Sequence, residues 1–492
     1  MKSSQPQIDE CQSGNSNSEK LMTGEIESCK TSPVPSFPWS PVSWQNCRLD
    51  QQAKYSDTTQ LDTTIKELSK LPPLVSVQEI EELKSKISSA ANGHSFVLQG
   101  GDCAELFSDC NAEAITDKLK ILLQMSLILV YGLNKPVVKI GRMAGQYAKP
   151  RSTETETAEG VTLPCYRGDL INGALFNKQQ RQPDPERLLK GYSFASLTLN
   201  YLRTLLDNRF SDLSNVDNWD LDFVAHSAKA HEYHEILDKI KYSQSVLKNL
   251  TLQSNQPSVK DKIFTCHEAL HLHYEQALTR QCDQGRWYNL STHMPWIGMR
   301  TCQLDSAHVE YMRGIENPVA IKIGPSMSPK QLLDLVNILD PDDTPGRLTL
   351  ITRFGQDKIR QHLPPMISIM QNEGKKPLWC CDPMHGNTSL TKQGRKTRQF
   401  NAIIAELTEA FQIHQENNSH LGGVHIELTG ENVTECVGGA RGLTELDLQK
   451  AYKSLVDPRL NAEQSLEMAI LITQLSQKFT ANLINKNGQS AT

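Results

Sequence analysis

Three residues of this sequence, Cys103, His385 and Glu427, have side chains that could bind one metal ion together. Each ends or follows a short apolar segment of the kind that forms a buried strand. A thiolate, an imidazole and a carboxylate provide sulfur, nitrogen and oxygen ligands, a mixture that suits a transition metal better than Mg²⁺ or Ca²⁺. The thiolate needs a lowered pKa, which the metal and a helix starting directly after the Cys103 segment would provide. Because a single cysteine after a strand is usually a buried structural thiol, the prediction depends on all three residues meeting in the fold.

A second group of residues is cationic and also lies within or after apolar segments. A charge in such a place is costly unless it meets an anion, and guanidinium groups bind carboxylates and phosphates through paired hydrogen bonds. Internal ion pairs with Asp or Glu are the alternative for any single member. Taken together, the group predicts a site for small phosphorylated substrates. Its members are Arg142, Lys149, Arg151, Arg300, Lys322 and Arg353.

The elements that must position these residues recur regularly along the chain. Eight short apolar, β-branched segments are separated by segments of helical character, which is typical of a parallel sheet covered by helices. The pattern predicts an α/β protein built as a (β/α)₈ TIM barrel, in which the loops after the strands carry the site and the first and eighth strands are neighbours. The predicted strands are 96–100, 137–141, 263–267, 288–292, 319–324, 348–353, 378–383 and 423–428.

The rest of the chain divides by composition. A polar N-terminal segment is predicted to be disordered, and an arm containing Trp39 and Trp44 is predicted to pack on the body or on a neighbouring subunit. A final amphipathic helix is predicted after Asn461, with Gln464 completing a capping box. The predicted divisions are a disordered segment at 1–36, the arm at 37–75 and the catalytic barrel at 76–485, with a helical insertion at about 180–260.

The overall composition excludes several classes of protein. The 492 residues carry a formal net charge of only −5, so no global field points to a nucleic acid or a membrane as partner. No apolar stretch reaches the roughly 18 residues that a membrane span needs, and the first residues lack the apolar core of a signal peptide. The 12 cysteines are scattered without a CxxC pair, as in a reduced compartment. We therefore predict a cytoplasmic enzyme.

One short motif supports a different function. His267-Glu268-x-x-His271 matches HExxH, the helical signature of zinc peptidases. The downstream residues of the extended form are absent, although the spacing leaves Glu310 open as a third ligand. Since so short a pattern often arises by chance, a zinc peptidase is a remote alternative. The favoured interpretation puts His267 and Glu268 at the end of the third strand, and His271 and His273 on the helix after it.

Longer motifs carry a specific family resemblance over residues 70–480. The chain closely resembles the class II 3-deoxy-D-arabino-heptulosonate 7-phosphate (DAHP) synthases. The resemblance implies a TIM-barrel transferase that condenses phosphoenolpyruvate (PEP) with erythrose 4-phosphate and water to give DAHP and phosphate, the first step of the shikimate pathway to chorismate and aromatic amino acids. The motifs are FVLQGGDCAELF, KIGRMAGQYAKPRS, LPCYRGDLIN, THMPWIG, PGRLTLITRFG, CDPMHGNT, GGVHIELTGENVTECVGG and DPRLN.

The resemblance also implies roles for individual residues. It places a divalent metal, Mn²⁺ or Co²⁺ with Zn²⁺ as a third candidate, on the residues named first and adds one aspartate from the DPRLN motif. Arg142, Arg300 and Lys322 would carry the catalytic work on PEP. The implied sets are Cys103, His385, Glu427 and Asp457 for the metal, Arg142, Arg300, Lys322 and Arg353 for PEP, and Lys149, Arg151 and Ser152 for erythrose 4-phosphate.

Met299, within the predicted substrate site, departs from the family pattern. The family usually has Glu before the PEP-site arginine, here Arg300, and a carboxylate there could position the attacking water, whereas Met cannot. A related DAHP or amino-DAHP synthase of secondary metabolism, or a weakly active regulatory paralogue, are therefore alternatives. The resemblance further implies a homo-oligomer (dimer or tetramer), an aromatic amino acid effector and a chorismate mutase partner.

Overall fold

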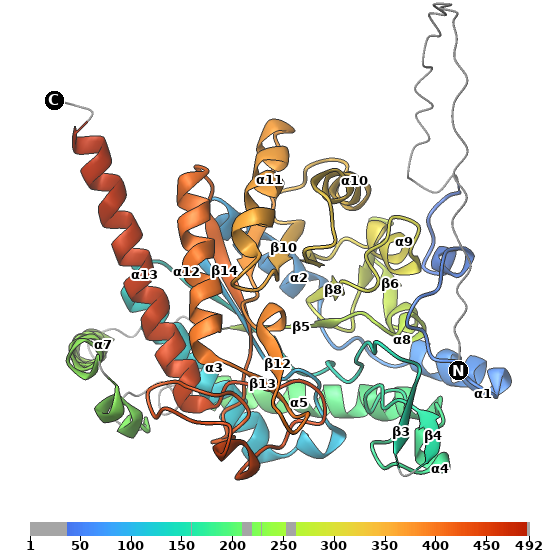
Figure 1. Ribbon diagram of the computed structural model, residues 1–492. Helices are drawn as coiled ribbons and strands as arrows, with labels where there is room; N and C mark the ends of the chain where they lie inside the picture. Colours follow the sequence, from blue (N-terminus) through green and yellow to red (C-terminus); the bar gives the residue numbers. More distant parts are fainter. Residues whose placement is uncertain (1–36, 159, 209–218, 228, 252–261, 490–492) are drawn as a thin grey trace, which may run out of the picture.

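The computed structural model describes residues 37–158, 160–208, 219–227, 229–251 and 262–489 (Figure 1). The segment 1–36, predicted to be disordered, lies outside the described residues. In the described part of the chain, none of the helices combines the length and apolar composition needed to cross a membrane.

Eight parallel strands close into a barrel, which confirms the predicted (β/α)₈ architecture. β1 pairs with β2 on one side and with β14 on the other, so the first and last barrel strands are neighbours as expected. In this register Gly101 lies opposite both Arg142 and Glu427. The barrel strands are β1 (Phe96–Gly101), β2 (Val137–Arg142), β5 (Ile263–Glu268), β8 (Met294–Ile297), β9 (Val319–Ile323), β10 (Leu348–Thr352), β11 (Leu378–Cys381) and β14 (Leu421–Glu427).

The predicted fourth strand, 288–292, is wrong. β7 (Trp287–Asn289) belongs instead to a hairpin outside the barrel, where it pairs antiparallel with β6 (Thr279–Gln281). The fourth barrel strand follows at β8 and contains Pro295. Proline lowers the strand propensity of a segment because it cannot donate to the ladder, so the sequence pattern favours the neighbouring segment 288–292 over the true strand.

Alternation along the strands separates two apolar layers. Val97 and Ile140 belong to a cluster inside the barrel, together with Phe264 and Trp296. Leu98, which follows Val97, packs outward against the helices in a larger cluster. Because successive strand residues point to opposite faces, this alternation fixes which side chains reach the inside of the barrel mouth.

Helices surround the barrel, and capping side chains mark the start of several of them. Ser76 and Glu79 form a capping box at the start of α2 (Val77–Ala91). Asn461 accepts a hydrogen bond from Gln464 N at 2.9 Å as α13 begins, which confirms the predicted cap. The other barrel helices are α3 (Ala112–Leu133), α8 (Leu272–Ala277), α9 (Ala307–Arg313), α10 (Pro329–Leu339), α11 (Ile359–Asn372), α12 (Phe400–Glu416) and α13 (Ala462–Gln489).

The expected helical insertion and N-terminal arm both pack on this frame (Figure 1). The insertion contributes α5 (Glu186–Asn208) and α7 (Ala230–Thr251), and both helices contact α3. In the arm, the buried Trp44 donates to Gln276 Oε1 at 3.0 Å, and Trp39 donates to the carbonyl of Glu310 at 3.0 Å. Smaller elements are α1 (Thr58–Ser69), α4 (Lys178–Arg181), the hairpin β3 (Thr155–Ala158) with β4 (Val161–Pro164), and the hairpin β12 (Thr388–Leu390) with β13 (Lys396–Arg398).

Candidate active site

The strand alternation brings a layer of polar and charged side chains to the carboxyl ends of the barrel strands. In β2, Arg142 comes two residues after the inward-facing Ile140, and in β9 Lys322 comes two residues after the inward-facing Ala320. Glu427 follows two residues after His425 in β14. A period of two places each of these charges on the inner face, above the apolar layer. The barrel interior is therefore apolar below and ionic at the mouth.

Three potential metal-binding side chains converge at this mouth. The ligand atoms of Cys103, Glu427 and Asp457, here called the donor cluster, all lie within 4.8 Å of one another. The ammonium of Lys149 lies among them, 2.5 Å from Cys103 Sγ, 2.6 Å from Asp457 Oδ2 and 4.0 Å from Glu427 Oε1. The ligand atoms of all three donors thus lie close to one positive charge, that of Lys149, as the donors of a cation site would.

His385, the fourth implied ligand, lies beside the donor cluster. Its Nε2 is 2.9 Å from Glu427 Oε1, and its Nδ1 is 2.7 Å from Asp382 Oδ2. A carboxylate on the other ring nitrogen is the usual support of a metal-binding histidine, because it fixes the ring and its tautomer. The donor types and this support fit a divalent transition metal.

The nearby cations lower the pKa of the carboxyl groups at the mouth. Burial opposes ionisation of Glu427, but the charges of His385, Arg398 and Lys149 outweigh it and hold its pKa well below the usual range. Burial also opposes ionisation of Asp457, yet Lys149 again keeps the pKa of this carboxyl low. Both carboxyl groups are consequently ionised at neutral pH.

Without a metal ion, the pKa of the Cys103 thiol is raised, so the expected lowering depends on the metal. Burial, with the nearby charge of Glu427, raises its pKa to about 12. The expectation of a helix start was wrong, since α3 begins only at Ala112, well after this cysteine. The positive charges of Lys149 and Arg142 lower the pKa of this thiol but do not outweigh burial. A metal ion would add the positive potential needed to form a thiolate.

Two of the residues implied for PEP share an aromatic floor. The guanidinium of Arg142 lies 5.3 Å and the ammonium of Lys322 lies 5.7 Å from the ring centroid of Trp296. Arg142 also donates to Glu427 Oε1 at 3.1 Å, and Lys322 donates to Asp382 Oδ2 at 3.1 Å. These buried cations are therefore paired with carboxylates, as the alternative interpretation allowed, and still face the mouth.

The other cations lie nearer the rim. Arg353 donates to the carbonyl of His385 at 2.9 Å and contacts the Met299 sulfur at 2.9 Å. Arg300 is exposed and donates to Ser152 Oγ at 2.9 Å, so it joins a residue implied for PEP to one implied for erythrose 4-phosphate. Arg151 lies beside them and pairs with Glu156 of β3 at 3.6 Å.

Sequence reasoning did not assign a role to several residues of this site. Glu105 accepts hydrogen bonds at 2.9–3.0 Å from the backbone of Ala144, Gly145 and Gln146, and so shapes the loop that leads to Lys149. His425 could have been found, since it lies two residues before Glu427 on the same strand face. Arg398 of β13, 2.8 Å from Glu427 Oε2, gave no such signal, because it comes from a hairpin outside the barrel.

The HExxH residues are not arranged as a zinc site. His267 and Glu268 end β5 as favoured, but His271 is the N-cap of α8 and only His273 lies within that helix. His267 Nε2 pairs with Glu275 Oε1 at 2.8 Å, whereas His271 Nε2 bonds to Tyr55 Oη at 2.7 Å. A peptidase needs both histidines on one helical face, so this geometry contradicts the peptidase alternative.

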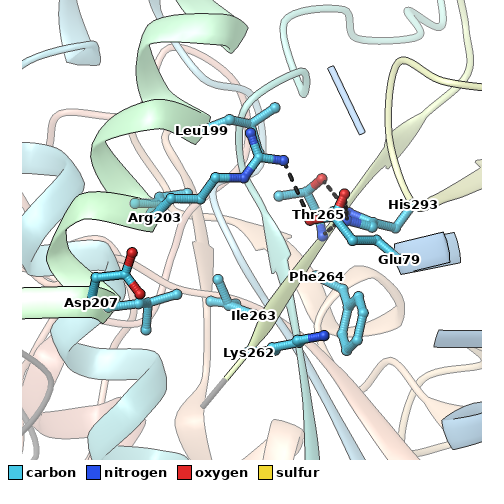
Figure 2. Close-up of a pocket in the computed structure, with 11 residues that line it drawn as sticks. Glu79, Leu199, Arg203, Asp207, Lys262, Ile263, Phe264, Thr265 and His293 are labelled. Atoms are coloured by element: carbon cyan, nitrogen blue, oxygen red, sulfur yellow. Dashed lines mark hydrogen bonds and ion pairs between the residues drawn. The ribbon is translucent and has the colours of Figure 1, made fainter. Parts of the chain in front are cut away.

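A second hollow lies at the opposite end of the barrel (Figure 2). It has a cavity volume of about 240 Å³ and opens between α2, α5 and the amino-terminal ends of β5 and β8. Arg203 and Lys262 line it together with Glu79 and Asp207, and Leu199, Leu202, Leu206, Ile263 and Phe264 provide apolar surface. The hollow thus combines both signs of charge with an apolar wall.

Comparisons with known proteins agree with the resemblance noted in the motifs. The model of the class-II DAHP synthetase family matches residues 39–473. The phospho-2-dehydro-3-deoxyheptonate aldolase of Neurospora crassa is 44% identical over 457 residues, covering 89% of this chain and 95% of that protein. The enzymes of the same name from Streptomyces coelicolor (44% identity, 88% of this chain and 96% of that one) and Mycolicibacterium smegmatis (41% identity, 83% and 88%) are also similar.

Proposed function

This chain belongs to the class-II DAHP synthetase family, and we propose how the residues of its barrel mouth carry out the reaction. The chain is a transferase, a 3-deoxy-7-phosphoheptulonate synthase, that condenses PEP with erythrose 4-phosphate and water. This reaction forms DAHP and phosphate and opens the shikimate pathway. The observation that carries the residue assignments is the donor cluster, ringed by substrate-binding cations.

Cys103, His385, Glu427 and Asp457 hold the divalent metal on which the family depends. We propose Mn²⁺ or Co²⁺, with Zn²⁺ as a third candidate, because the donor set mixes sulfur, nitrogen and oxygen. When bound, the ion supplies Lewis acidity to the aldehyde of erythrose 4-phosphate. With the charge of the ion among the donors, Lys149 would be left to bind the phosphate of the same substrate.

Arg142 and Lys322 hold PEP over the Trp296 floor, and Arg353 and Arg300 complete the binding of its carboxylate and phosphate. Their paired guanidinium donors fit both anionic groups. With PEP fixed in this way, its C3 is directed at the aldehyde carbon, so proximity and fixed positive charge lower the barrier.

Erythrose 4-phosphate enters over the loop that follows β2. Lys149, Arg151 and Ser152 supply its phosphate contacts, and the hydrogen bond between Arg300 and Ser152 couples the two substrate sites. Glu105 supports this assignment, because it holds the first part of the loop by three backbone hydrogen bonds.

Phosphate release from PEP tests the proposal. Purified protein supplied with Mn²⁺, Co²⁺ or Zn²⁺ should release phosphate from PEP only when erythrose 4-phosphate is present. Arg142→Gln and Lys322→Gln should each lower kcat/KM for PEP at least 100-fold, since each removes a buried donor to an anionic substrate. Absence of release with any metal and any aldose phosphate would instead support a regulatory paralogue.

We also propose that the second hollow binds the expected aromatic amino acid effector (Figure 2). Arg203 and Lys262 suit a carboxylate, Glu79 and Asp207 suit an ammonium, and the leucine-rich wall with Phe264 suits an aromatic ring. Calorimetric titration with phenylalanine, tyrosine and tryptophan should detect binding of at least one. Arg203→Gln should weaken that binding while phosphate release without effector stays unchanged.

The remaining expectations stay predictions. These are a cytoplasmic location, a homo-oligomer of two or four subunits and association with a chorismate mutase. Size-exclusion chromatography with light scattering, alone and with added chorismate mutase, tests the last two.

A further inference from the structure

Glu268 is a carboxylate at the barrel mouth to which the proposed assignments give no task. It is the last residue of β5 and lies two positions after Cys266, which faces the barrel interior, so its side chain is on the inner face. Its backbone is firmly held, because its N–H donates to Gln146 Oε1 at 2.9 Å and it pairs in register with Trp296. Glu268 therefore stands at the level of the PEP floor.

The carboxylate of Glu268 has no ion pair among the described residues, and its buried Oε1 has no hydrogen-bond partner within the described ranges. Glu427 Oε2 also lacks a hydrogen bond but lies 2.8 Å from the Arg398 guanidinium. Asp382 pairs with Lys322 and His385, and Glu427 pairs with Arg142 and Arg398. A buried polar atom without a partner is costly, and at the mouth of a substrate site its natural partner is a water molecule or a substrate group.

The surroundings of Glu268 suit a group that exchanges a proton. Burial raises its pKa above the ordinary value, although the positive charges of Lys322, Lys149, Arg300 and Arg142 oppose that change. A general base works best when its pKa lies near the working pH. The same four cations bind the substrates in the proposed site, so the carboxylate and the substrates share one electrostatic environment.

Gly298 and Met299, the two residues that follow β8, offer no carboxylate of their own next to Glu268. Gly298 has no side chain, and a Cβ built there would overlap Glu268 Oε1, so the carboxylate fills that space. Met299 is neutral and places its sulfur 2.9 Å from Arg353. We infer that Glu268 binds the water that adds to C2 of PEP and accepts its proton, an inference that rests on the proposed function.

The step balances without a further reactant. As C3 of PEP bonds to the aldehyde carbon, C2 becomes electron-poor, and the oxygen of the water bonds to C2 while one proton passes to Glu268. The C2–O bond to phosphate then breaks, and phosphate leaves with the bonding electron pair. The hydroxyl on C2 loses its proton to become the ketone of the product. The two protons that the water gives up, one of them through Glu268, balance those taken up by the aldehyde oxygen, which becomes a hydroxyl, and by the departing phosphate.

Glu268→Gln is the direct test. It keeps the shape and removes the base, so kcat should fall about 100-fold or more, in line with the loss of a general base. The affinity for PEP, measured calorimetrically with Mn²⁺ present, should stay within about threefold, and the acidic limb of the pH profile of kcat should disappear. Glu310→Gln, a buried carboxylate of the outer helix α9, is the matched control and should keep kcat.

Two further variants separate catalysis from structure. Gly298→Ala should displace the carboxylate without removing it and lower kcat about 10-fold. Met299→Glu, introduced into Glu268→Gln, should restore part of kcat by supplying a carboxylate at the neighbouring strand end. Full kcat in Glu268→Gln, or a loss of PEP affinity that accounts for the whole defect, would overturn the inference. Failure of the proposed function is distinguishable, because the unmodified protein would then release no phosphate.

Discussion

Two regions of this barrel present metal-binding residue types in opposite ways. The HExxH segment brings its residues together in sequence, but the strand end and the start of α8 separate them, and His267 and His271 bond to different partners. The donor cluster draws Cys103, Glu427 and Asp457 from distant parts of the chain, and their ligand atoms lie within 4.8 Å. Proximity in sequence and proximity in space are therefore independent here.

The two regions also differ in charge: the carboxylates of the donor cluster are ionised, whereas His271 of the HExxH segment is neutral. In the donor cluster nearby cations keep the carboxylates ionised, so a positive charge is needed at its centre. In the HExxH segment burial, with His273 and His308 nearby, lowers the pKa of His271 to about 3, so this ring is neutral. One region is built to hold a cation, whereas the other acts as a set of structural hydrogen bonds.

Removing Lys149 should produce the largest effect. In Lys149→Met the ionised donors lose their central positive charge, so the metal-free protein should lose about 3 kcal/mol of unfolding free energy, the usual cost of breaking a buried pair. Added Mn²⁺ should then raise the Tm of this variant more than that of the unmodified protein. Thermal unfolding with and without Mn²⁺ measures both effects. An unchanged metal-free Tm would show that the cluster needs no cation.

Cys103→Ser should come next in size and distinguishes the two regions directly. Loss of the sulfur ligand should weaken Mn²⁺ or Co²⁺ binding about 10- to 100-fold, with activity recovered in part at high metal concentration. His271→Ala and Cys381→Ser, a thiol buried in β11, should leave metal affinity unchanged. Metal titration of the unmodified protein and the three variants shows which region binds the metal. Weaker binding in His271→Ala with normal binding in Cys103→Ser would place the metal at the HExxH segment instead of the donor cluster.

The neutral state of His271 should appear as a dependence of stability on pH. Its folded pKa of about 3 lies below the ordinary 6.5, so its contribution is present above pH 6.5 and is lost as pH falls towards 3. At pH 5.5 the loss should be about 1.4 kcal/mol. Urea unfolding at pH 7.5 and 5.5 should therefore show a smaller decrease for His271→Gln than for the unmodified protein. Equal decreases would mean that this histidine does not resist protonation.

Lys396→Met should have the smallest effect. Lys396 bonds to Asp457 Oδ1 at 2.7 Å, but its side chain is 46% exposed. Removing an exposed positive charge next to the donor cluster should raise metal affinity by at most about fivefold, since such pairs are worth about 1 kcal/mol or less. The change should vanish at high salt. If metal affinity changed as much in Lys396→Met as in Lys149→Met, and did so at any salt concentration, Lys396 would not be a peripheral charge.

The sequence by itself determined the barrel and most of the residues that line its mouth. Segments such as 96–100 are buried on both faces of the sheet. A parallel strand of this kind is a nearly continuous apolar run, so the sequence alone can predict it. Charges directly after such segments or near their carboxyl ends are then predicted at the mouth, as Arg142 and Lys322 illustrate. The prediction was wrong at β8, where Pro295 lowers the strand signal.

Only the tertiary structure decided which of these residues meet. Closure of the barrel puts β1 beside β14, and long loops carry Asp457 and Lys149 to the same point, although nothing in their local sequence fixes that meeting. The structure also separated His267 from His271 and left Glu268 with an oxygen that has no partner among the described residues. Strand burial depends on local composition, whereas contacts between loops depend on the closed path of the whole chain.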